Sequence, residues 1–323
     1  MAASDPHASL TAVRQDLERA VIGQEGLVQR LLIALLVDGH LLVEGAPGLA
    51  KTRAIKALSD RLEARFQRVQ FTPDLLPADL TGTEVYRPQD GTFVFQEGPL
   101  FNQLVLADEI NRAPAKVQSA LLEAMAEQQI SVGHRTYALP SPFMVMATQN
   151  PIEQEGTYPL PEAQLDRFLM HVRVGYPDAM REAEILRLVR HEFRHRSDGQ
   201  AVPVERLALD TLFAARHEVL DVHLSDSVED YIVRLVTTTR APASEAMARW
   251  IEVGASPRGT LALDACARAH AWLDGRDYVS PGDVQAVVHD VLRHRVLLSY
   301  EAEADGTDGD AVIDALLREV VVA

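Results

Sequence analysis

The sequence contains very little cysteine and very little lysine. Cys266 is the only cysteine among 323 residues, so no disulfide can form within the chain and no group of thiolates can bind a metal. Lysine occurs only at positions 51, 56 and 116, and arginine supplies the other basic side chains. Each lysine can therefore be considered individually, and Lys51 is the one that lies in a glycine-rich segment.

The sequence also lacks long apolar runs and an excess of positive charge. A membrane-spanning helix needs about 20 apolar residues, and Arg30, Asp38 and His40 interrupt the longest apolar run. The N-terminus has no basic segment followed by an apolar one, as a secretory signal would. The 47 acidic and 31 basic residues give a net charge of −16, which argues against a protein whose main task is to bind nucleic acid. We expect a cytoplasmic protein without an integral membrane segment or a nucleic-acid partner.

The first half of the chain contains five short apolar runs that predict buried strands. Gly, Pro, Asp or Asn flank each run, and helical patterns lie between several of them. Apolar strands joined by helical crossovers are typical of a parallel sheet with helices on both faces, which is an α/β fold. The predicted strands are residues 40–44, 68–71, 103–107, 143–148 and 169–174.

The second half of the chain has helical patterns and no convincing strand. Serine followed by proline at 256–257 and at 280–281 predicts two helix starts, each with a capping residue and proline in the first turn. We therefore expect an α/β domain of residues 1–175 and an all-helical domain of residues 176–323. The predicted helices are residues 178–195, 205–220, 225–241, 258–274 and 280–300.

The glycine-rich segment GAPGLAKT lies between a predicted strand and a predicted helix. This is the context of the phosphate-binding loop (P-loop), G-x-x-x-x-G-K-[ST]. Backbone N–H groups and the positive end of the helix dipole attract phosphate, Lys51 neutralises the outer phosphates, and the Thr52 hydroxyl binds magnesium. The residues predicted to contact the nucleotide are Gly45, Ala46, Pro47, Gly48, Leu49, Ala50, Lys51 and Thr52.

Ala50 departs from this pattern, which has glycine before the lysine. Alanine is excluded only if the backbone needs a positive φ or if Cβ would strike the ligand. We predict helical φ and ψ angles for Ala50, with its methyl group directed away from the phosphates. A positive φ would favour the alternative that the loop has decayed.

Two acidic residues, Asp108 and Glu109, end the third predicted strand after four apolar residues. An aspartate at the carboxyl end of a parallel strand faces the ligand crevice of an open sheet. Asp108 is therefore predicted to hold magnesium, directly or through water, and Glu109 to act as the general base that polarises the attacking water. Two solvated acids are the alternative. The guanine-specific pattern [NT]-K-x-D is absent, which argues against a GTPase.

The order and density of these motifs resemble the AAA+ ATPases and, within them, the MoxR family of the helix-2-insert clade. The resemblance covers nearly the whole chain and implies a P-loop AAA+ core with a parallel five-stranded sheet, followed by a C-terminal all-helical lid. Loops of the form GxPGLAKT are usual in this family, which accounts for Ala50. The matching stretches are residues 21–25 (VIGQE), 40–52, 71–82, 98–127, 147–168 and 254–263.

The resemblance also implies roles for four residues outside the loop. Ile22 resembles a residue that lines the adenine pocket, and Asn150 resembles sensor 1, which orients the attacking water. Arg167 resembles the arginine finger, which reaches the γ-phosphate bound by the neighbouring subunit. Arg258 resembles sensor 2, which is thought to act across the subunit interface in this clade.

The residues alone support these roles unequally. Arg258 lies in the first turn of a predicted helix, where a cation opposes the helix dipole at a cost of about 0.3–1 kcal/mol, and an anionic partner would remove that cost. A solvated arginine is the alternative. Asn150 follows a buried strand, but a turn asparagine before proline would look the same. Arg167 has the weakest independent case, because LDRF could be a helix end packed on the next strand.

Two segments predict β-hairpins. Residues 83–96 place alternating β-formers around a Pro/Asp-Gly turn, and residues 129–140 form a similar pattern. The first resembles the insertion into the second helix that marks the clade. Hairpins of this kind in related machines face the central pore or the substrate, whereas decoration of the sheet is the alternative.

The resemblance implies a magnesium-dependent ATPase that binds ATP and assembles into a hexameric ring, because an arginine finger from a neighbour leaves the single subunit incomplete. It implies chaperone-like remodelling or maturation of client proteins or metal-cofactor complexes, with a partner that carries a von Willebrand A-type domain. The alternative is an ATP-regulated binding module with little turnover. A DNA-remodelling protein is disfavoured by the acidic charge, and no segment of the sequence identifies the client.

Overall fold

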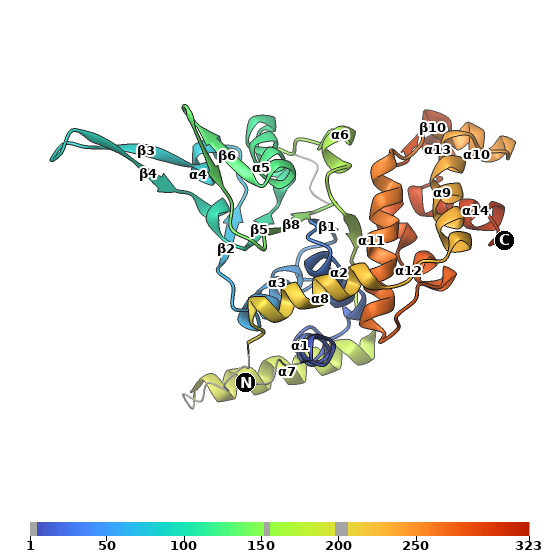
Figure 1. Cartoon of the computed structure of the whole chain (residues 1–323), viewed down its shortest axis with the longest axis horizontal. Helices are drawn as coiled ribbons and strands as arrows, with labels where there is room; N and C mark the ends of the chain where they lie inside the picture. The colour runs from blue at the N-terminus through green and yellow to red at the C-terminus, as the bar shows by residue number, and fades with distance from the viewer. Residues whose placement is uncertain (1–4, 152–155, 198–205, 323) are drawn as a thin grey trace.

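The computed structural model describes residues 5–151, 156–197 and 206–322. At its centre is a sheet of five parallel strands in the order β2, β5, β8, β1, β9 (Figure 1). All five strands predicted from the sequence are confirmed, with bounds shifted by one or two residues. They are β1 (Leu41–Glu44), β2 (Phe66–Gln70), β5 (Leu104–Asp108), β8 (Met144–Gln149) and β9 (Met170–Arg173).

Helices pack on both faces of this sheet, so its central strands are buried at nearly every position. Leu41 and Val43 belong to one hydrophobic cluster and Leu42 to the other, as the alternation of side chains along a strand requires. The first cluster contains α1 (Pro6–Ala20), α2 (Glu25–Leu36) and α3 (Lys51–Asp60), and the second contains α5 (Ala115–Glu127). Because the strands are parallel, their carboxyl ends meet at one edge of the sheet. The predicted P-loop follows β1 at this edge, and the two acids lie at the end of β5.

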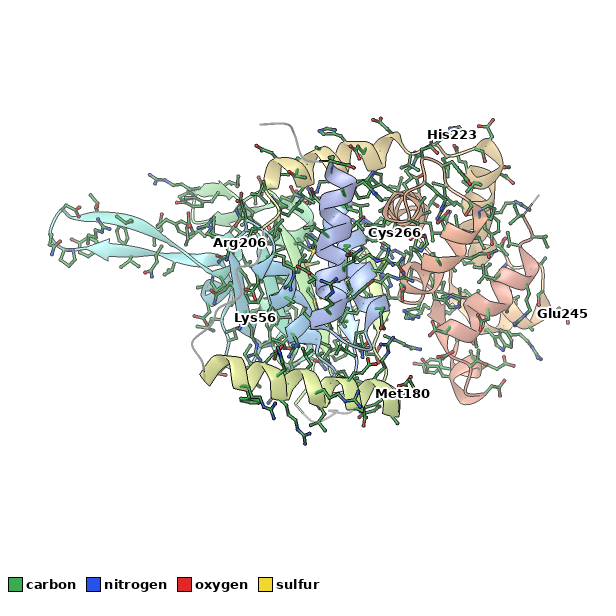
Figure 2. The ribbon with its side chains drawn as sticks, turned by 90° about the horizontal axis from the view of Figure 1, so that it is seen from below. Lys56, Met180, Arg206, His223, Glu245 and Cys266 are labelled. Atoms are coloured by element: carbon green, nitrogen blue, oxygen red, sulfur yellow. The ribbon has the colours of Figure 1, made fainter. Side chains whose placement is uncertain are left out.

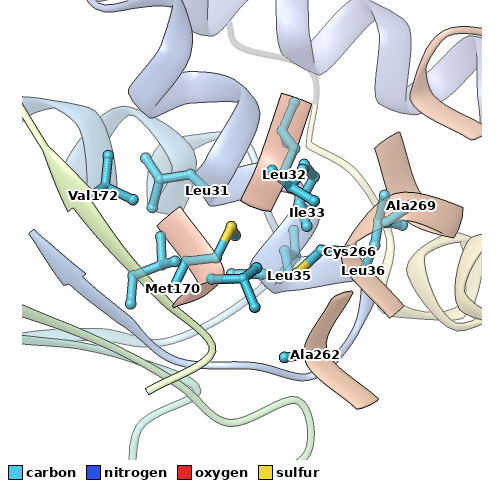
Figure 3. Packing of buried hydrophobic residues seen from close by; sticks show 14 of the residues in the cluster. Leu31, Leu32, Ile33, Leu35, Leu36, Met170, Val172, Ala262, Cys266 and Ala269 are labelled. Carbon is cyan, nitrogen blue, oxygen red and sulfur yellow. The ribbon is translucent and has the colours of Figure 1, made fainter. Parts of the chain in front are cut away.

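The first hydrophobic cluster continues from the sheet into the C-terminal helices. Leu35 of α2 lies between Met170 of β9 and Cys266 of α11 (Pro257–Leu273), and Leu31 of α2 lies beside Val172 of β9 (Figure 3). Burial raises the pKa of the Cys266 thiol to about 12, so this cysteine is a packing residue rather than a reactive one. The α/β core and the helical region therefore share hydrophobic packing along α2.

Both predicted hairpins are present. The first pairs β3 (Gly82–Arg87) with β4 (Thr92–Glu97), and it projects well beyond the body of the molecule (Figures 1 and 2). The second pairs β6 (Gln129–Val132) with β7 (Arg135–Ala138). Phe95 and Tyr137 stack at 4.1 Å between ring centroids, so the second hairpin supports the base of the first.

The second half of the chain is mainly helical, which confirms the predicted fold class. Ser256 accepts a hydrogen bond from the N–H of Arg258, and Asp283 accepts from the N–H and hydroxyl of Ser280, so both predicted helix starts are confirmed. The helices are α7 (Ala179–Ser197), α8 (Leu209–Asp221), α9 (Asp226–Arg240), α10 (Glu245–Trp250), α11, α12 (Pro281–Leu292), α13 (Tyr300–Ala304) and α14 (Gly309–Glu319). Among the described residues, no helix is both long and apolar enough to span a membrane.

The expectation that this half contains no strand is wrong. β10 (Ile251–Val253) and β11 (Leu297–Leu298) form a small antiparallel ribbon, and the helix predicted over residues 280–300 ends at Leu292. Segments of two or three residues are too short to show an alternating pattern, which is why the sequence did not indicate them.

The two helices that follow the sheet lie along the core. α8 packs against α1, and Arg216 of α8 donates two hydrogen bonds to the carbonyl of Leu35 in α2. α7 runs along the outside of the molecule, as the position of Met180 shows (Figure 2). The domain boundary near Tyr176 stays a prediction.

Candidate functional site: a P-loop cavity and a separate arginine cavity

A cavity of about 390 Å³ lies at the edge where β1, β5 and β8 end. We call it the P-loop cavity. It brings together most of the residues predicted to bind the nucleotide, metal and attacking water, although Gly45 and Ala46 lie outside its lining. Its lining residues are Pro47, Gly48, Leu49, Ala50, Lys51, Thr52, Arg53, Arg68, Asp108, Glu109, Thr148, Gln149 and Asn150.

Gly45, which follows β1, is required because the backbone of Val174 passes very close to it. A Cβ atom at this position would lie 2.8 Å from the carbonyl oxygen of Val174 and 3.2 Å from the Val174 Cβ. The Gly45 N–H donates to the carbonyl of Gln149 at 3.3 Å, which ties the start of the loop to the end of β8. Gly45 therefore shapes the loop from outside the cavity.

Ala50 does not have the helical conformation predicted for it. Its φ of 58° and ψ of 16° lie in the left-handed region, so that prediction is wrong. Ala50 is the N-cap residue of α3. The turn into this helix places Ala50 in the left-handed conformation, which glycine adopts most readily. Alanine there costs on the order of 1 kcal/mol. Ala50 is nevertheless packed against the first hydrophobic cluster, so its methyl group contributes to the core.

The positive φ is the result that would favour a decayed loop, but the rest of the cavity argues against decay. Lys51 Nζ donates to the carbonyls of Gly45 and Gln149, so the ammonium lies across the mouth of the loop. Burial lowers the pKa of Lys51, and the charges of Asp108 and Glu109 partly oppose this. A half-buried ammonium whose hydrogen-bond partners are backbone carbonyls gains strongly from an anionic phosphate.

Asp108 is held by both of its carboxylate oxygens. Oδ1 accepts a hydrogen bond of 2.6 Å from the Thr148 hydroxyl, and Oδ2 accepts from Arg68 Nη2 at 2.7 Å and Nε at 3.1 Å. Thr52 lines the same cavity and carries a hydroxyl group. Hard oxygen donors of this kind suit Mg²⁺, so the residues present fit the metal that the motif implies.

The Glu109 carboxylate is held at the side of the P-loop cavity. Its Oε2 accepts hydrogen bonds from Gln70 Nε2 at 2.7 Å and from Arg112 Nη1 at 3.0 Å. The backbone of Glu109 is left-handed, with φ of 59°, and its N–H donates to the Thr148 hydroxyl. Asn150 follows β8 and is only 6% exposed, on the wall of the same cavity.

Sequence reasoning missed Arg68, Gln70, Arg112 and Thr148. Arg68 and Gln70 are two residues apart on β2, so their side chains lie on one face of the strand, and each contacts one of the two acids. The sequence does show two polar residues at positions i and i+2. This pair indicates contacts with the two acids only once β2 is known to lie beside β5.

A second, smaller cavity adjoins the P-loop cavity. Ile22 lines it together with Pro177 and with Ile185 and Leu188 of α7, and Gly48, Leu49, Ala50 and Arg53 line both cavities. Its wall is largely apolar, which suits the flat face of a base. The position of Ile22 is thus consistent with its predicted role, whereas the contribution of α7 was not foreseen.

Arg167 and Arg258 do not reach the P-loop cavity. Both line another cavity of about 400 Å³, which we call the arginine cavity and which shares no described lining residue with the P-loop cavity. Arg167 Nη1 donates to the carbonyl of Leu122 at 2.9 Å, and Arg258 Nη1 lies 3.7 Å from Asp166 Oδ2. Arg295 Nε, 3.0 Å from Asp166 Oδ1, provides the stronger pairing for that aspartate.

His270, Asp274 and Asp283 form the one group of metal-ligand side chains found close together among the described residues. Arg276 donates to both oxygens of Asp283, and Ser280 donates to one of them. Burial alone would raise the pKa of Asp283, but these hydrogen bonds lower it well below its usual range. The group therefore joins α11 to the start of α12 as an ion-pair network.

A glycine-rich loop between a strand and a helix, together with two acids at the carboxyl end of another parallel strand of the same sheet, defines a P-loop nucleotide-binding protein. Residues 40–170 match the ATPase family associated with various cellular activities (AAA), and residues 244–316 match the AAA lid domain. The chain is 46% identical to Chaperone MoxR1 of Mycobacterium tuberculosis over 95% of its length and 80% of the relative's. It is 35% identical to Protein MoxR of Paracoccus denitrificans, over 99% of this chain and 98% of the other.

A solved structure agrees with this grouping. A crystal structure from Cytophaga hutchinsonii, described as a candidate ATPase, is 44% identical and superposes with a TM-score of 0.89 over 98% of this chain and 96% of the other. The chain belongs to the MoxR family of AAA+ ATPases.

Proposed function

We propose that the protein binds Mg-ATP in the P-loop cavity and hydrolyses it to ADP and phosphate as a ring of identical subunits. Lys51 and the backbone of the P-loop would hold the phosphates, and the apolar cavity beside Ile22 would take the adenine. Thr52 and Asp108 would hold Mg²⁺, which neutralises charge on the phosphates when bound. The convergence of these residues in adjoining cavities supports this part of the proposal.

Hydrolysis would depend on the two polar groups beside the metal ligands. Glu109 would accept the proton of the attacking water, and Asn150 would orient that water. The hydrogen bonds from Gln70 and Arg112 both go to Oε2 of Glu109, so Oε1 is the oxygen that would accept the proton. Glu109→Gln is expected to bind ATP without hydrolysing it.

The observation that carries the proposed ring is the separation of the arginine cavity from the P-loop cavity. Arg167 and Arg258 lie together, and neither lines the cavity where their proposed phosphate ligand would bind. An arginine that reaches the nucleotide of a neighbouring subunit explains both facts. A closed ring, a hexamer by the family resemblance, gives every subunit such a neighbour.

The work done by the ring is proposed from its relatives. Chaperone MoxR1 is named as a chaperone, so we propose a cytoplasmic chaperone-like ATPase that remodels or matures client proteins or metal-cofactor complexes. We also propose a partner with a von Willebrand A-type domain. The client is left open.

A nucleotide-regulated binding module with little turnover is the second candidate, and the restraint of Glu109 by Gln70 and Arg112 favours it. Phosphate release per subunit, measured as protein concentration rises, separates the two. A ring ATPase gains specific activity as it assembles, whereas a flat trace near zero would support the binding module.

A further inference from the structure

Arg68 is a basic residue of the P-loop cavity to which neither the motifs nor the proposed mechanism gives a role. It lies on β2, the edge strand of the sheet, two residues before Gln70. Its guanidinium contacts Asp108 Oδ2 through two nitrogens, at 2.7 Å and 3.1 Å, and its Nη2 also donates to Gln70 Oε1 at 3.1 Å. Arg68 therefore binds the carboxylate proposed to hold Mg²⁺.

The two oxygens of Asp108 are not equivalent. Oδ1 accepts the Thr148 hydroxyl within the core of the site, where Thr148 is buried. Oδ2 is bound by Arg68, whose side chain is 51% exposed, whereas the Asp108 side chain is only 12% exposed. Oδ2 is thus the oxygen whose partner is half exposed, and Arg68, unlike the buried Thr148, has solvent into which it can move.

We propose that Arg68 and Mg²⁺ are alternative partners of Asp108 Oδ2. Arg68 is then a positioning residue that keeps the carboxylate oriented and neutralised, and Mg²⁺ must displace it to enter the site. This inference rests on the proposed function. By this inference, Arg68 helps to set the Mg²⁺ concentration at which the site binds the metal.

The competition follows from charge and geometry. Mg²⁺ demands oxygen ligands at about 2.0–2.1 Å in near-ideal octahedral geometry, and a guanidinium that donates two hydrogen bonds to the same oxygen stands in its path. A released Arg68 remains on the wall of the cavity that Lys51 also lines, where a nucleotide phosphate offers it a new anionic partner. The simpler alternative is a fixed ion pair that only fastens the edge strand β2 to β5.

Binding of a fluorescent ADP analogue, titrated with Mg²⁺, tests the proposal without relying on turnover. Arg68→Gln removes the competing cation, so the half-saturating Mg²⁺ concentration should fall about fivefold, the factor expected for a half-exposed ion pair. Arg68→Lys keeps the charge but loses the two-nitrogen contact and should give an intermediate value. Arg112→Gln is the matched control, because it removes an arginine that contacts Glu109 instead of Asp108.

Three results would overturn the proposal. The Mg²⁺ midpoint of Arg68→Gln could equal that of the wild type, it could fall no further than in Arg112→Gln, or folded Arg68→Gln could lose nucleotide binding altogether. Circular dichroism and the thermal midpoint would establish that each variant is folded. Failure of the wild-type protein itself to bind the analogue at any Mg²⁺ concentration is a different result, because it contradicts the proposed function and the inference together.

Discussion

The P-loop cavity and the arginine cavity both contain basic and acidic residues, but they differ in how firmly their basic side chains are held. In the P-loop cavity, Asp108 and Glu109 are each bound by an arginine, and Lys51 is bound to backbone carbonyls. In the arginine cavity, Arg167 holds one backbone carbonyl and Arg258 only a distant carboxylate oxygen. Both cavities contain acidic and basic side chains, but Arg167 and Arg258 are weakly engaged, whereas Arg295 in the same cavity is paired with Asp166.

This difference indicates what each cavity contributes to an active site. Asp166, the acid beside Arg258, is already shared by Arg295 and Ser256, so it does little to neutralise Arg258. A weakly paired arginine is the kind of group that an incoming phosphate would engage. We therefore interpret the P-loop cavity as the binding half of an active site and the arginine cavity as the half that each subunit offers to its neighbour.

The largest expected effect is that of Arg167→Ala on hydrolysis. An arginine finger contributes on the order of a thousandfold or more to kcat, so phosphate release should fall by about that factor. The affinity for a fluorescent ATP analogue should stay within about threefold, because Arg167 lies outside the P-loop cavity. A loss of nucleotide affinity as large as the loss of turnover would break the separation between the two cavities.

Lys51→Ala, unlike Arg167→Ala, should lower the affinity for the nucleotide. It removes the ammonium at the mouth of the loop, and a charged hydrogen bond of about 1.5–3 kcal/mol predicts a loss of nucleotide affinity of roughly tenfold to a hundredfold. Fluorescence titration with the same analogue measures it, and Lys56→Ala on the same helix serves as the control. Equal affinities for Lys51→Ala and Lys56→Ala would contradict the assignment of the loop.

His40, on the wall of the arginine cavity, predicts an acid-sensitive stability. Burial lowers its pKa from 6.5 to about 4, and its ring links the carbonyl of Met125 to the N–H of Val145. The unfolded chain binds the proton first, so this contribution is present above pH 6.5 and is lost as the pH falls toward 4, by up to about 3 kcal/mol.

Urea unfolding at pH 7 and pH 4.5 measures this change. Because acidic groups also titrate in this range, the comparison should be made with His40→Gln, whose free energy of unfolding should fall less between the two pH values. An equal fall in both proteins would show that His40 does not titrate on unfolding.

The smallest predicted effect is that of Ala50→Gly. Glycine relieves the strain of a left-handed backbone at φ of 58°. It also gives the unfolded chain more conformational freedom, which offsets part of that gain. The free energy of unfolding should therefore rise by only about 0.5 kcal/mol. Urea unfolding measures this, and Ala54→Gly inside α3 is the matched control, expected to destabilise. A loss of stability in Ala50→Gly as large as in Ala54→Gly would show that the strain is absent.

The parts of this picture that the sequence predicted are those that depend on local patterns. The five strands were visible as apolar runs, and the loop, Asp108 and Glu109 were visible because their spacing lies within one strand and its flank. Arg68 and Gln70 were missed because their contacts depend on the β2–β5 register, which no local pattern reveals. Ala50 was judged from helix propensity, but the geometry of the turn overrode it.

The most direct test of the account is to mix two inactive proteins. Glu109→Gln lacks the proposed base but keeps Arg167, and Arg167→Ala keeps Glu109. If one subunit's arginine completes its neighbour's site, the mixture should regain phosphate release well above either variant alone, since some interfaces pair an intact Glu109 with an intact Arg167. The mass of the rings should first establish that they contain both variants. If such mixed rings are no more active than the two separate proteins, the proposal that one subunit's arginine completes its neighbour's site is contradicted.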